Sequence, residues 1–378
     1  MDRKRFCQLA GSAVLLTAAT SLFPHKKILK YAYCKPVKSS DFKFSYEKYR
    51  LNLQHTWTTS GSSSDFRDIV IVKIEKDGVT GIGEAAPSKR YNETADSVLS
   101  FIKKSESLIS QSDLWQFHEL NENLNKISDG EYAAKTALDT AILDWVTKKL
   151  NIPLYKYFGL DKNKTPITSF SIGIDKPDIV RQKVKEAADY PLLKIKVGYP
   201  EDKEMIDAVR SVTNKTIRVD ANEGWKIKEE AVEKINWLAS QGVEFVEQPM
   251  PANMLEEMKW VKKRVKIPLI ADENVKTARD IPSLVGAYDG INIKLMKCGG
   301  IQEALRMIAL ARSLNLKIMV GCMIESSLAI TAMAHLTPLV DYADLDGNLL
   351  ISNDPFKSGV KVEKGKLILP DEAGLGVK

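Results

Sequence analysis

The feature that most restricts the fold of this chain is a regular alternation of short apolar runs and amphipathic segments after residue 165. This alternation is typical of repeated βα units, in which helices join parallel strands. The predicted strands are 167–174, 193–197, 217–221, 244–247, 269–272, 291–295, 318–323 and 343–346. Eight strands with seven intervening helices predict an α/β barrel of the TIM type over residues 161–349, with its last helix missing or rearranged.

A doubly wound open sheet is the alternative architecture for the same alternation. That fold would carry a glycine-rich phosphate loop after its first strand. Gly173 stands alone at this position, so we favour the barrel.

Residues 41–160 follow a different pattern and predict a separate α+β domain. Alternating residues predict antiparallel strands, interrupted by a loop at 55–68 that is rich in Ser, Thr and Gly. Helical periodicity follows at 94–104, 113–125 and 132–149. The tail at 359–369 is strand-like again, and we expect segment 350–378 to complete this first domain.

Residues 1–40 have the pattern of an export signal. A basic start, Arg3-Lys4-Arg5-Phe6, precedes an apolar stretch, Leu9–Ala19, that is too short to span a bilayer. The start is similar to a twin-arginine signal with lysine in place of the second arginine, so the general secretory route and an uncleaved signal anchor remain alternatives. We expect an exported, periplasmic protein without a stable membrane span in its mature form, and a cytoplasmic location is the less favoured alternative.

The leader also carries most of the net charge of +6. Residues 1–30 hold six basic residues and one acidic residue, which leaves 6 − 5 = +1 for the rest of the chain. Without a basic face, nucleic acid is not an expected partner. If Cys7 is removed with the leader, the remaining cysteines, Cys34, Cys298 and Cys322, are too few for a disulfide framework.

Charged residues recur at the predicted carboxyl ends of the barrel strands, where barrel enzymes place their functional groups. The second strand ends with Lys194 and Lys196, which share one face because strand alternation has a period of two. Asp220, Glu247 and Asp272 end the next three strands. Three oxygen ligands without His or Cys predict a hard-cation site, for Mg²⁺ or its substitute Mn²⁺. An ion pair with a barrel lysine is the alternative for any one carboxylate.

A further lysine, Lys294, lies in the apolar run of the sixth strand and is predicted to face the second strand across the barrel. A carboxylate held by the metal gains an acidic α-proton, and bases on opposite faces, Lys196 and Lys294, can remove and return that proton with inversion. Lys194 supports them as a cation. Lys297 is the rival base, but we favour Lys294 because Lys297 falls in the following turn. This pattern is typical of a racemase or epimerase.

These residues stand in motifs that resemble the muconate-lactonising subgroup of the enolase superfamily. The motifs are Lys194-x-Lys196, Asp220-Ala-Asn-Glu-Gly-Trp225, Glu247-Gln-Pro, Ala-Asp272-Glu-Asn and Ile-Lys294-Leu-Met-Lys-Cys-Gly-Gly300, and the resemblance extends over the chain after the leader. It implies a modified (β/α)7β barrel under an N-terminal capping domain. It also implies two lysine bases, an enediolate intermediate and one magnesium ion on the three carboxylates.

The end of the eighth strand, Asp344-Leu345-Asp346-Gly347, is similar to the Asp-x-Asp element of dipeptide epimerases of the L-Ala-D/L-Glu type. Two carboxylates on one side suit the α-ammonium group of a dipeptide. Cycloisomerases and o-succinylbenzoate synthases act on acids without an ammonium group and would gain nothing from this pair. A strand-end turn held by Asx hydrogen bonds is the alternative interpretation.

Other residues are assigned less specific roles. The resemblance implies that capping loops 55–67 and 85–94 choose the epimerised side chain. The cations there that suit an acidic side chain, or are plain surface charges, are Arg67, Lys89 and Arg90. Side chains predicted to lie behind the site are Asn222, Glu325 and Lys297, and Glu325 suits a helix N-terminus equally well.

The sequence therefore predicts a Mg²⁺-dependent isomerase that epimerises the C-terminal residue of a dipeptide, with L-Ala-D/L-Glu from murein peptides as the expected substrate. N-acylamino acid racemisation, cycloisomerisation, o-succinylbenzoate synthesis or dehydration on the same scaffold are the alternatives. A non-catalytic peptide-binding barrel is a remote alternative, because it would lack a ligand or a base and all five positions are filled. A homo-oligomer is compatible with the sequence, which carries no signal on this point.

Overall fold

The computed structural model describes residues 42–378. The predicted export signal therefore lies outside the described residues. Within the described part of the chain, no helix combines the length and apolar character needed to cross a membrane.

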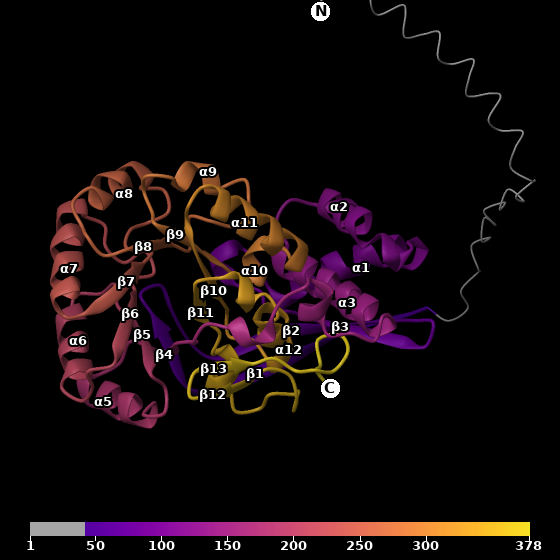
Figure 1. Cartoon of the computed structure of the whole chain (residues 1–378), viewed down its shortest axis with the longest axis horizontal. Coiled ribbons are helices and arrows are strands. Elements are labelled where there is room, and N and C mark those ends of the chain that lie inside the picture. The colour runs from indigo at the N-terminus through magenta and orange to yellow at the C-terminus, as the bar shows by residue number, and fades with distance from the viewer. Residues whose placement is uncertain (1–41) are drawn as a thin grey trace, which may run out of the picture. The chain divides into compact units, whose positions relative to one another are not determined.

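Eight parallel strands form a barrel, in the spatial order β11-β10-β9-β8-β7-β6-β5-β4 (Figure 1). Their bounds are β4 Phe170–Ile172, β5 Leu192–Lys196, β6 Thr216–Asp220, β7 Val243–Glu247, β8 Leu269–Ala271, β9 Gly290–Ile293, β10 Lys317–Gly321 and β11 Tyr342–Asp344. A bridge between Thr168 and Ala343 brings the first and last strands together. The ring is therefore nearly closed, which confirms the predicted barrel.

Helices on the outside of the barrel join its strands. They are α5 Pro177–Glu186, α6 Asp202–Arg210, α7 Lys228–Ser240, α8 Leu255–Lys262, α9 Ile281–Leu284, α10 Leu295–Cys298, α11 Ile301–Ser313 and α12 Ser327–Ala334. The eighth strand, β11, is followed by the 3₁₀ turn Gly347–Leu350 in place of an α-helix. The missing last helix is thus confirmed.

Alternation along each barrel strand separates the packing face from the interior. In β6, the fully buried Val219 belongs to the apolar core, whereas Arg218 and Asp220 have the opposite orientation. Arg218 lies in the interior one layer before Asp220, and its guanidinium carbon is 5.1 Å from the ring centroid of Phe245 and 4.8 Å from that of Tyr342. Functional groups are left to the carboxyl ends of the strands.

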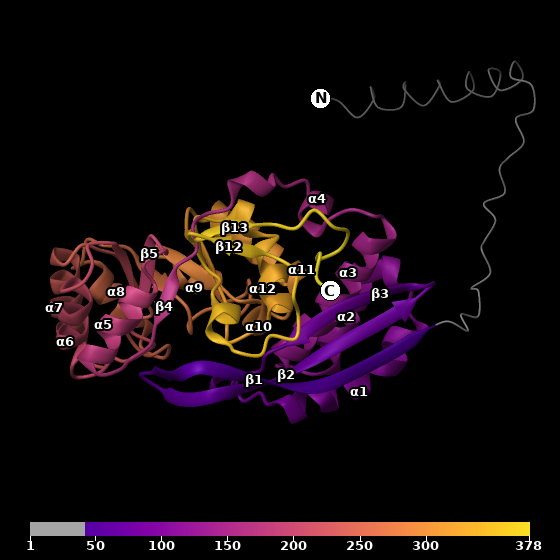
Figure 2. The ribbon, with the colours of Figure 1, turned by 90° about the horizontal axis from the view of Figure 1, so that it is seen from below.

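The N-terminal domain, the cap, is an antiparallel sheet of three strands packed against helices (Figure 2). Its elements are β1 Lys43–Thr59, β2 Ser62–Lys76, β3 Val79–Ala85, α1 Ala95–Gln111, α2 Phe117–Ile127, α3 Tyr132–Lys149 and α4 Leu154–Tyr157. Helix α3 approaches β3 so closely that a Cβ atom on Gly81 or Gly83 would lie 2.0 Å from a helix carbonyl oxygen. Only glycine permits this contact.

The predicted loop at residues 55–68 is wrong. Strands β1 and β2 continue through it and leave only a short turn at Ser60 and Gly61. Polar side chains pair across the two strands, as in the 2.6 Å hydrogen bond from Thr56 to Asp65. The hairpin also docks on the barrel, where Ile174 donates its N–H to the Thr58 carbonyl at 3.1 Å. Its polar composition reflects an exposed ladder, which single-sequence patterns confuse with a loop.

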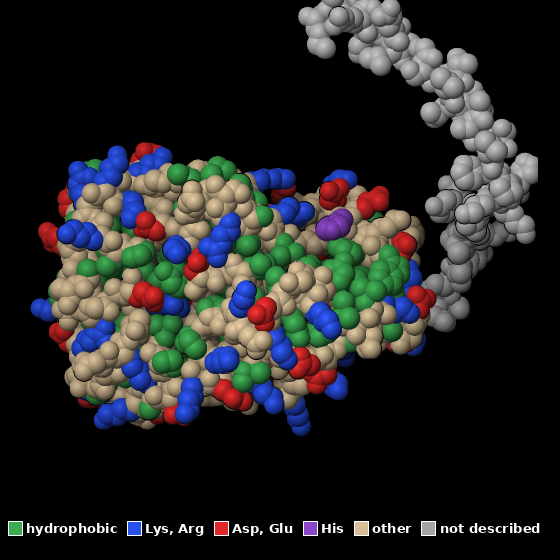
Figure 3. All heavy atoms as spheres, viewed as in Figure 1, with side chains coloured by type: hydrophobic (Ala, Val, Ile, Leu, Met, Phe, Trp, Pro, Cys, Tyr) green, Lys and Arg blue, Asp and Glu red, His purple; other side chains and the backbone are tan. Residues whose placement is uncertain are grey.

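The tail is strand-like as predicted, with a hairpin of β12 Lys361–Glu363 and β13 Lys366–Ile368. This hairpin lies against the start of the barrel, where Ile167 bridges to Lys366. The segments on either side of the hairpin contact the cap, as shown by the bridge between Leu53 and Ile351. Basic and acidic side chains are interspersed on the face of the molecule shown in Figure 3.

Candidate active site

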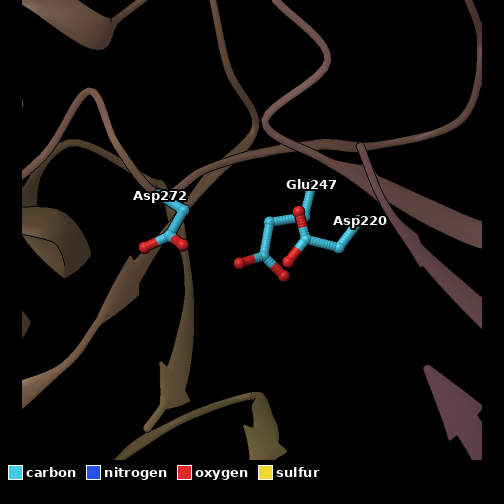
Figure 4. Close-up of side chains that lie close together, drawn as sticks. All are labelled: Asp220, Glu247 and Asp272. Atoms are coloured by element: carbon cyan, nitrogen blue, oxygen red, sulfur yellow. The ribbon is translucent and has the colours of Figure 1, made fainter. Parts of the chain in front are cut away.

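Three carboxylates meet at the carboxyl ends of β6, β7 and β8. Asp220 ends β6, Glu247 ends β7 and Asp272 directly follows β8. All three are buried, and one oxygen from each lies within 4.8 Å of the others. Figure 4 shows the three side chains directed toward a shared space. The structure thus brings together all three residues predicted to bind a metal.

The donor set and its electrostatics fit a divalent cation. Bonds of about 2.1 Å to one Mg²⁺ place ligand oxygens about 3 to 4 Å apart, and carboxylates are its preferred protein ligands. Burial, reinforced by the Asp220 carboxylate, raises the pKa of Glu247 to about 7. A cation would relieve this repulsion, so the residues present fit the predicted metal.

The two predicted bases enter the site from opposite sides of the ring. Lys196 ends β5 and Lys294 follows β9, with β6, β7 and β8 between them in the sheet order. In a ring of eight strands, positions four apart face each other. The Lys196 ammonium lies 2.7 Å from Asp220 Oδ2, and the Lys294 ammonium lies 2.8 Å from Asp272 Oδ2. The three carboxylates therefore lie between two lysines.

Lys194 is a fully enclosed cation at the centre of the site. Its ammonium lies 2.6 Å from Asp344, 2.7 Å from Glu247 and 3.1 Å from Asp220. Burial by itself would lower the pKa of Lys194, but the carboxylates of Asp344 and Glu247 outweigh it and raise that pKa well above its usual value. This lysine therefore stays charged, as suits a group that holds an anion.

Lys294 and its rival Lys297 have different surroundings. Lys294 lines the cavity above the carboxylates. Lys297 is buried, and its ammonium contacts Asp272 Oδ1 and donates to the backbone oxygens of Asp272 at 2.6 Å and Asn292 at 3.1 Å. The geometry favours Lys294 as the residue that reaches a substrate, while Lys297 holds Asp272.

The charge on Lys294 depends on the same carboxylates that are assigned to the metal. Burial lowers the pKa of Lys294, but Asp272 and Glu247 raise it well above its usual value. Protonated Lys294 is the form that can deliver a proton to a carbanion.

Asp344, the last residue of β11, and Asp346, two residues further on, face the site, and polar groups at and just before β4 hold both. The Ser169 hydroxyl donates to Asp344 Oδ1 at 2.5 Å, and the Ser171 N–H donates to Asp346 Oδ2 at 2.6 Å. Both carboxylates line the cavity. They form an acidic wall beside Lys194 that suits a cationic group of a ligand.

A cavity of about 830 Å³ lies above these groups and is roofed by the cap. Trp57 of β1 extends over the barrel, with its ring centroid 5.9 Å from the Lys196 ammonium. The three capping-loop cations differ in their environment. All three line the cavity, but Arg90 is occupied by two hydrogen bonds to Glu223, Lys89 is exposed, and Arg67 is half-buried.

The other side chains predicted behind the site lie at different depths. Asn222 donates its N–H to Asp220 Oδ1 at 3.0 Å and lines the cavity. Glu325 is buried in the loop after β10, where it accepts the Met323 N–H at 2.8 Å. Burial raises the pKa of Glu325 to about 8. Within the described residues it has no hydrogen bond to the lysines or to the three carboxylates.

Sequence reasoning missed three polar residues that hold the functional groups. They are Ser169, directly before β4, Ser171 of β4, and Asn292 of β9, whose amide donates to Glu247 Oε1 at 2.7 Å. Each is a polar residue at an inward position of an apolar strand predicted from the sequence. The alternation of inward and outward side chains along a strand could therefore have pointed to these residues. It does not show which functional group each of them contacts.

Comparisons with known proteins agree with this geometry. Residues 179–378 match the family described as enolase C-terminal domain-like, and residues 49–159 match the mandelate racemase/muconate lactonizing enzyme N-terminal domain. The chain belongs to the enolase superfamily. An L-Ala-D/L-Glu epimerase from Bacteroides thetaiotaomicron is 47% identical to this superfamily member, over 89% of this chain and 87% of its own.

Two further relatives of this enolase-superfamily chain are also named as epimerases. An L-Ala-D/L-amino acid epimerase from Pedosphaera parvula is 44% identical over 87% of this chain and 97% of its own. A crystal structure of a dipeptide epimerase from Enterococcus faecalis, complexed with Mg and L-Leu-L-Tyr, has a TM-score of 0.85 at 34% identity. That match covers 89% of this chain and 99% of the other.

Proposed function

We propose that this protein is a Mg²⁺-dependent dipeptide epimerase that inverts the α-carbon of the C-terminal residue. The observation that carries the proposal is the arrangement of Lys196 and Lys294 on opposite sides of the three carboxylates. One lysine removes the α-proton and the other returns a proton to the opposite face, so the configuration inverts. The three named relatives, all of them epimerases, support this reaction.

The chain's own residues bind the two ends of the dipeptide. Mg²⁺, when bound by the three carboxylates, would hold the substrate's C-terminal carboxylate and make its α-proton acidic. Lys194 adds a fixed positive charge beside that carboxylate. Asp344 and Asp346 receive the α-ammonium group at the other end, because their carboxylates line the same cavity. Mn²⁺ is the proposed substitute for Mg²⁺.

We infer that the preferred epimerised residue is acidic and that Arg67 receives its side chain. Burial outweighs the attraction of Asp68 and lowers the pKa of Arg67, as expected for a cation without a close partner. Over residues 42–378, no hydrogen bond or ion pair engages this guanidinium, whereas Arg90 is bound by Glu223. The Glu named in the relative from Bacteroides supports an acidic residue, and the Tyr bound in the Enterococcus structure is the alternative.

The source of the substrate and the location of the enzyme are further proposals. The basic and apolar leader supports export, and a periplasmic enzyme would meet murein peptides released from the cell wall. Fractionation of cells that express the full chain tests the location. Recovery of the mature protein with the cytoplasmic fraction would contradict export.

Proton NMR in D₂O tests the reaction directly. The full chain with Mg²⁺ is incubated with L-Ala-L-Xaa dipeptides and, in parallel, with N-acylamino acids. We expect loss of the α-proton signal at the second residue of the dipeptides together with appearance of the L,D epimer. Turnover of the N-acylated acids alone would identify a racemase and contradict the role of Asp344 and Asp346. If the α-proton signal persists in all the dipeptides and all the N-acylamino acids, proton abstraction from both classes of substrate is contradicted.

A further inference from the structure

One carboxylate, Glu223, connects the cap to two loops of the barrel. Arg90, in the cap turn Lys89–Tyr91, donates two hydrogen bonds to it, Nε to Oε2 and Nη2 to Oε1, both at 2.8 Å. Glu223 Oε1 also accepts the N–H of Ala252, in the loop after β7, at 2.8 Å. Its side chain is only 18% exposed. A bidentate pair to a largely buried carboxylate is stronger and more directional than an ordinary surface ion pair.

Glu223 belongs to the turn that follows the metal-assigned residue Asp220. Asn222 and Glu223 both have left-handed backbone angles, with φ of 43° and 67°. Non-glycine residues keep such angles only where surrounding contacts impose them. The contacts here are the 3.0 Å bond from the Asn222 N–H to Asp220 Oδ1 and the 2.7 Å bond from the Ser60 hydroxyl to the Asn222 carbonyl. The cap hairpin and Arg90 thus hold one turn from both sides.

The same turn is linked to the other two metal-assigned residues. The Glu223 N–H donates at 3.0 Å to the carbonyl of Gln248, which directly follows Glu247. The Gln248 side-chain oxygen accepts the Asp272 N–H at 2.9 Å. Asn274 completes the network, because its side chain accepts from Gln248 at 2.6 Å and donates to the Ala252 carbonyl at 2.8 Å. Hydrogen bonds therefore run without a gap from the cap turn to all three carboxylate-bearing loops.

We propose that Glu223 is a positioning residue that couples the seating of the cap, through Arg90, to the placement of the three metal-assigned carboxylates. The proposal rests on the metal assignment of the proposed function and extends it to residues of the cavity wall that are not metal ligands. Its physical basis is that metal ligands are oriented by the groups hydrogen-bonded around them, and removal of such a partner typically weakens metal binding about 10- to 100-fold. Coupling is reciprocal, so Mg²⁺ must in turn hold the cap turn in place.

Calorimetric titration of the full chain with Mg²⁺, without dipeptide, measures the first half of the coupling. We expect Glu223→Gln to bind Mg²⁺ about tenfold more weakly, because the amide presents a donor to Arg90 or Ala252 where both need an acceptor. Arg90→Met should weaken binding by a smaller factor, since the bond from Ala252 survives. Lys89→Met is the matched control from the same turn. It should bind Mg²⁺ as tightly as the unmodified chain.

Hydrogen exchange measures the second half at Tyr91, Asn92 and Glu93, whose N–H groups donate within the cap turn. Mg²⁺ should slow exchange at these amides in the unmodified chain and in Lys89→Met, but not in Arg90→Met. A purely structural role for Arg90 would speed exchange equally with and without Mg²⁺. Unchanged Mg²⁺ affinity in Glu223→Gln, or undiminished protection by Mg²⁺ in Arg90→Met, overturns the proposal.

These outcomes are separable from failure of the proposed reaction, because no readout uses turnover. A chain that binds Mg²⁺ but epimerises no dipeptide would leave the coupling test intact and contradict only the substrate assignment. Absence of saturable Mg²⁺ binding by the unmodified chain would overturn the coupling together with the metal assignment on which it rests.

Discussion

The Lys194 ammonium lies 2.6 Å from Asp344 Oδ2, and this contact joins the proposed ammonium-binding wall to the metal-assigned carboxylates. Lys194 comes from β5 and Asp344 from β11, which are separated by β4 around the nearly closed ring. The lysine also contacts Asp220 and Glu247. One cation therefore connects the two regions that would bind the two ends of a dipeptide.

Asp346→Asn should weaken dipeptide turnover selectively. Loss of one partner from a buried charge pair costs about 2 kcal/mol or more, so kcat/KM for L-Ala-L-Glu should fall at least about 30-fold, mainly through KM. N-acetyl-L-glutamate carries an acetyl group where the dipeptide carries alanyl and so has no ammonium group, and any residual turnover of it should be unaffected. Steady-state kinetics on the two substrates provide the comparison. An equal loss on both substrates would show that Asp346 does not act through the ammonium group.

Replacement of either base should abolish epimerisation. Lys196→Ala and Lys294→Ala each remove one of two proton-transfer groups, and such groups typically contribute about 10²- to 10⁴-fold in rate. Chiral chromatography after incubation with L,L and L,D dipeptides measures inversion from both sides. Lys259→Ala, which breaks only an exposed pair with Glu256, is the control. Full epimerisation by either base variant would refute the two-base assignment.

Arg67→Gln should change the side-chain preference. The variant should lose about 30-fold or more in kcat/KM for L-Ala-L-Glu, as expected for an unpaired buried carboxylate, and change little for L-Ala-L-Met. A competition assay with both dipeptides in one tube gives the ratio of the two kcat/KM values directly. Lys89→Gln should keep the original ratio because Lys89 is exposed. If Arg67→Gln also keeps it, another group binds the acidic side chain or the preferred residue is not acidic.

His335 should make the protein less stable in acid. Its Nδ1 accepts the Tyr155 N–H at 3.2 Å and its Nε2 donates to the Leu375 carbonyl at 3.2 Å, so the neutral ring satisfies both neighbours. Burial lowers the pKa of His335 from 6.5 to about 4. Between these values the unfolded state binds more protons, so stability present above pH 6.5 is lost as the pH falls toward 4.

Urea unfolding at several pH values measures this loss. The contribution of His335 approaches roughly 3 kcal/mol, at about 1.4 kcal/mol for each unit of pKa shift. In His335→Gln, the slope of the unfolding free energy against pH between 6.5 and 4.5 should decrease by about 1.4 kcal/mol per pH unit. This decrease corresponds to the uptake of one proton fewer on unfolding. An unchanged slope would show that other groups account for the acid sensitivity.

Local sequence patterns were sufficient to predict the barrel and the convergence of charged side chains at the ends of its strands. Alternating βα segments specify parallel strands, and the side-chain period of two places Lys194 and Lys196 on one face. The carboxyl ends of neighbouring strands meet at one edge, so Asp220, Glu247 and Asp272 had to converge once the barrel was correct. Those predictions follow from backbone periodicity, which the sequence by itself determines.

Only the tertiary structure showed which side chains from distant segments of the chain contact each other. The polar run at 55–68 became the end of a hairpin because it docks on the loop after β4, a contact that no local pattern encodes. The sequence did not distinguish among the three candidate cations Arg67, Lys89 and Arg90. The structure does, because Glu223, 133 residues after Arg90, binds only Arg90 among them. Such pairings depend on packing between the cap and the barrel. Residues far apart in the chain become neighbours only when these two surfaces pack, so their contacts cannot be read from the local sequence.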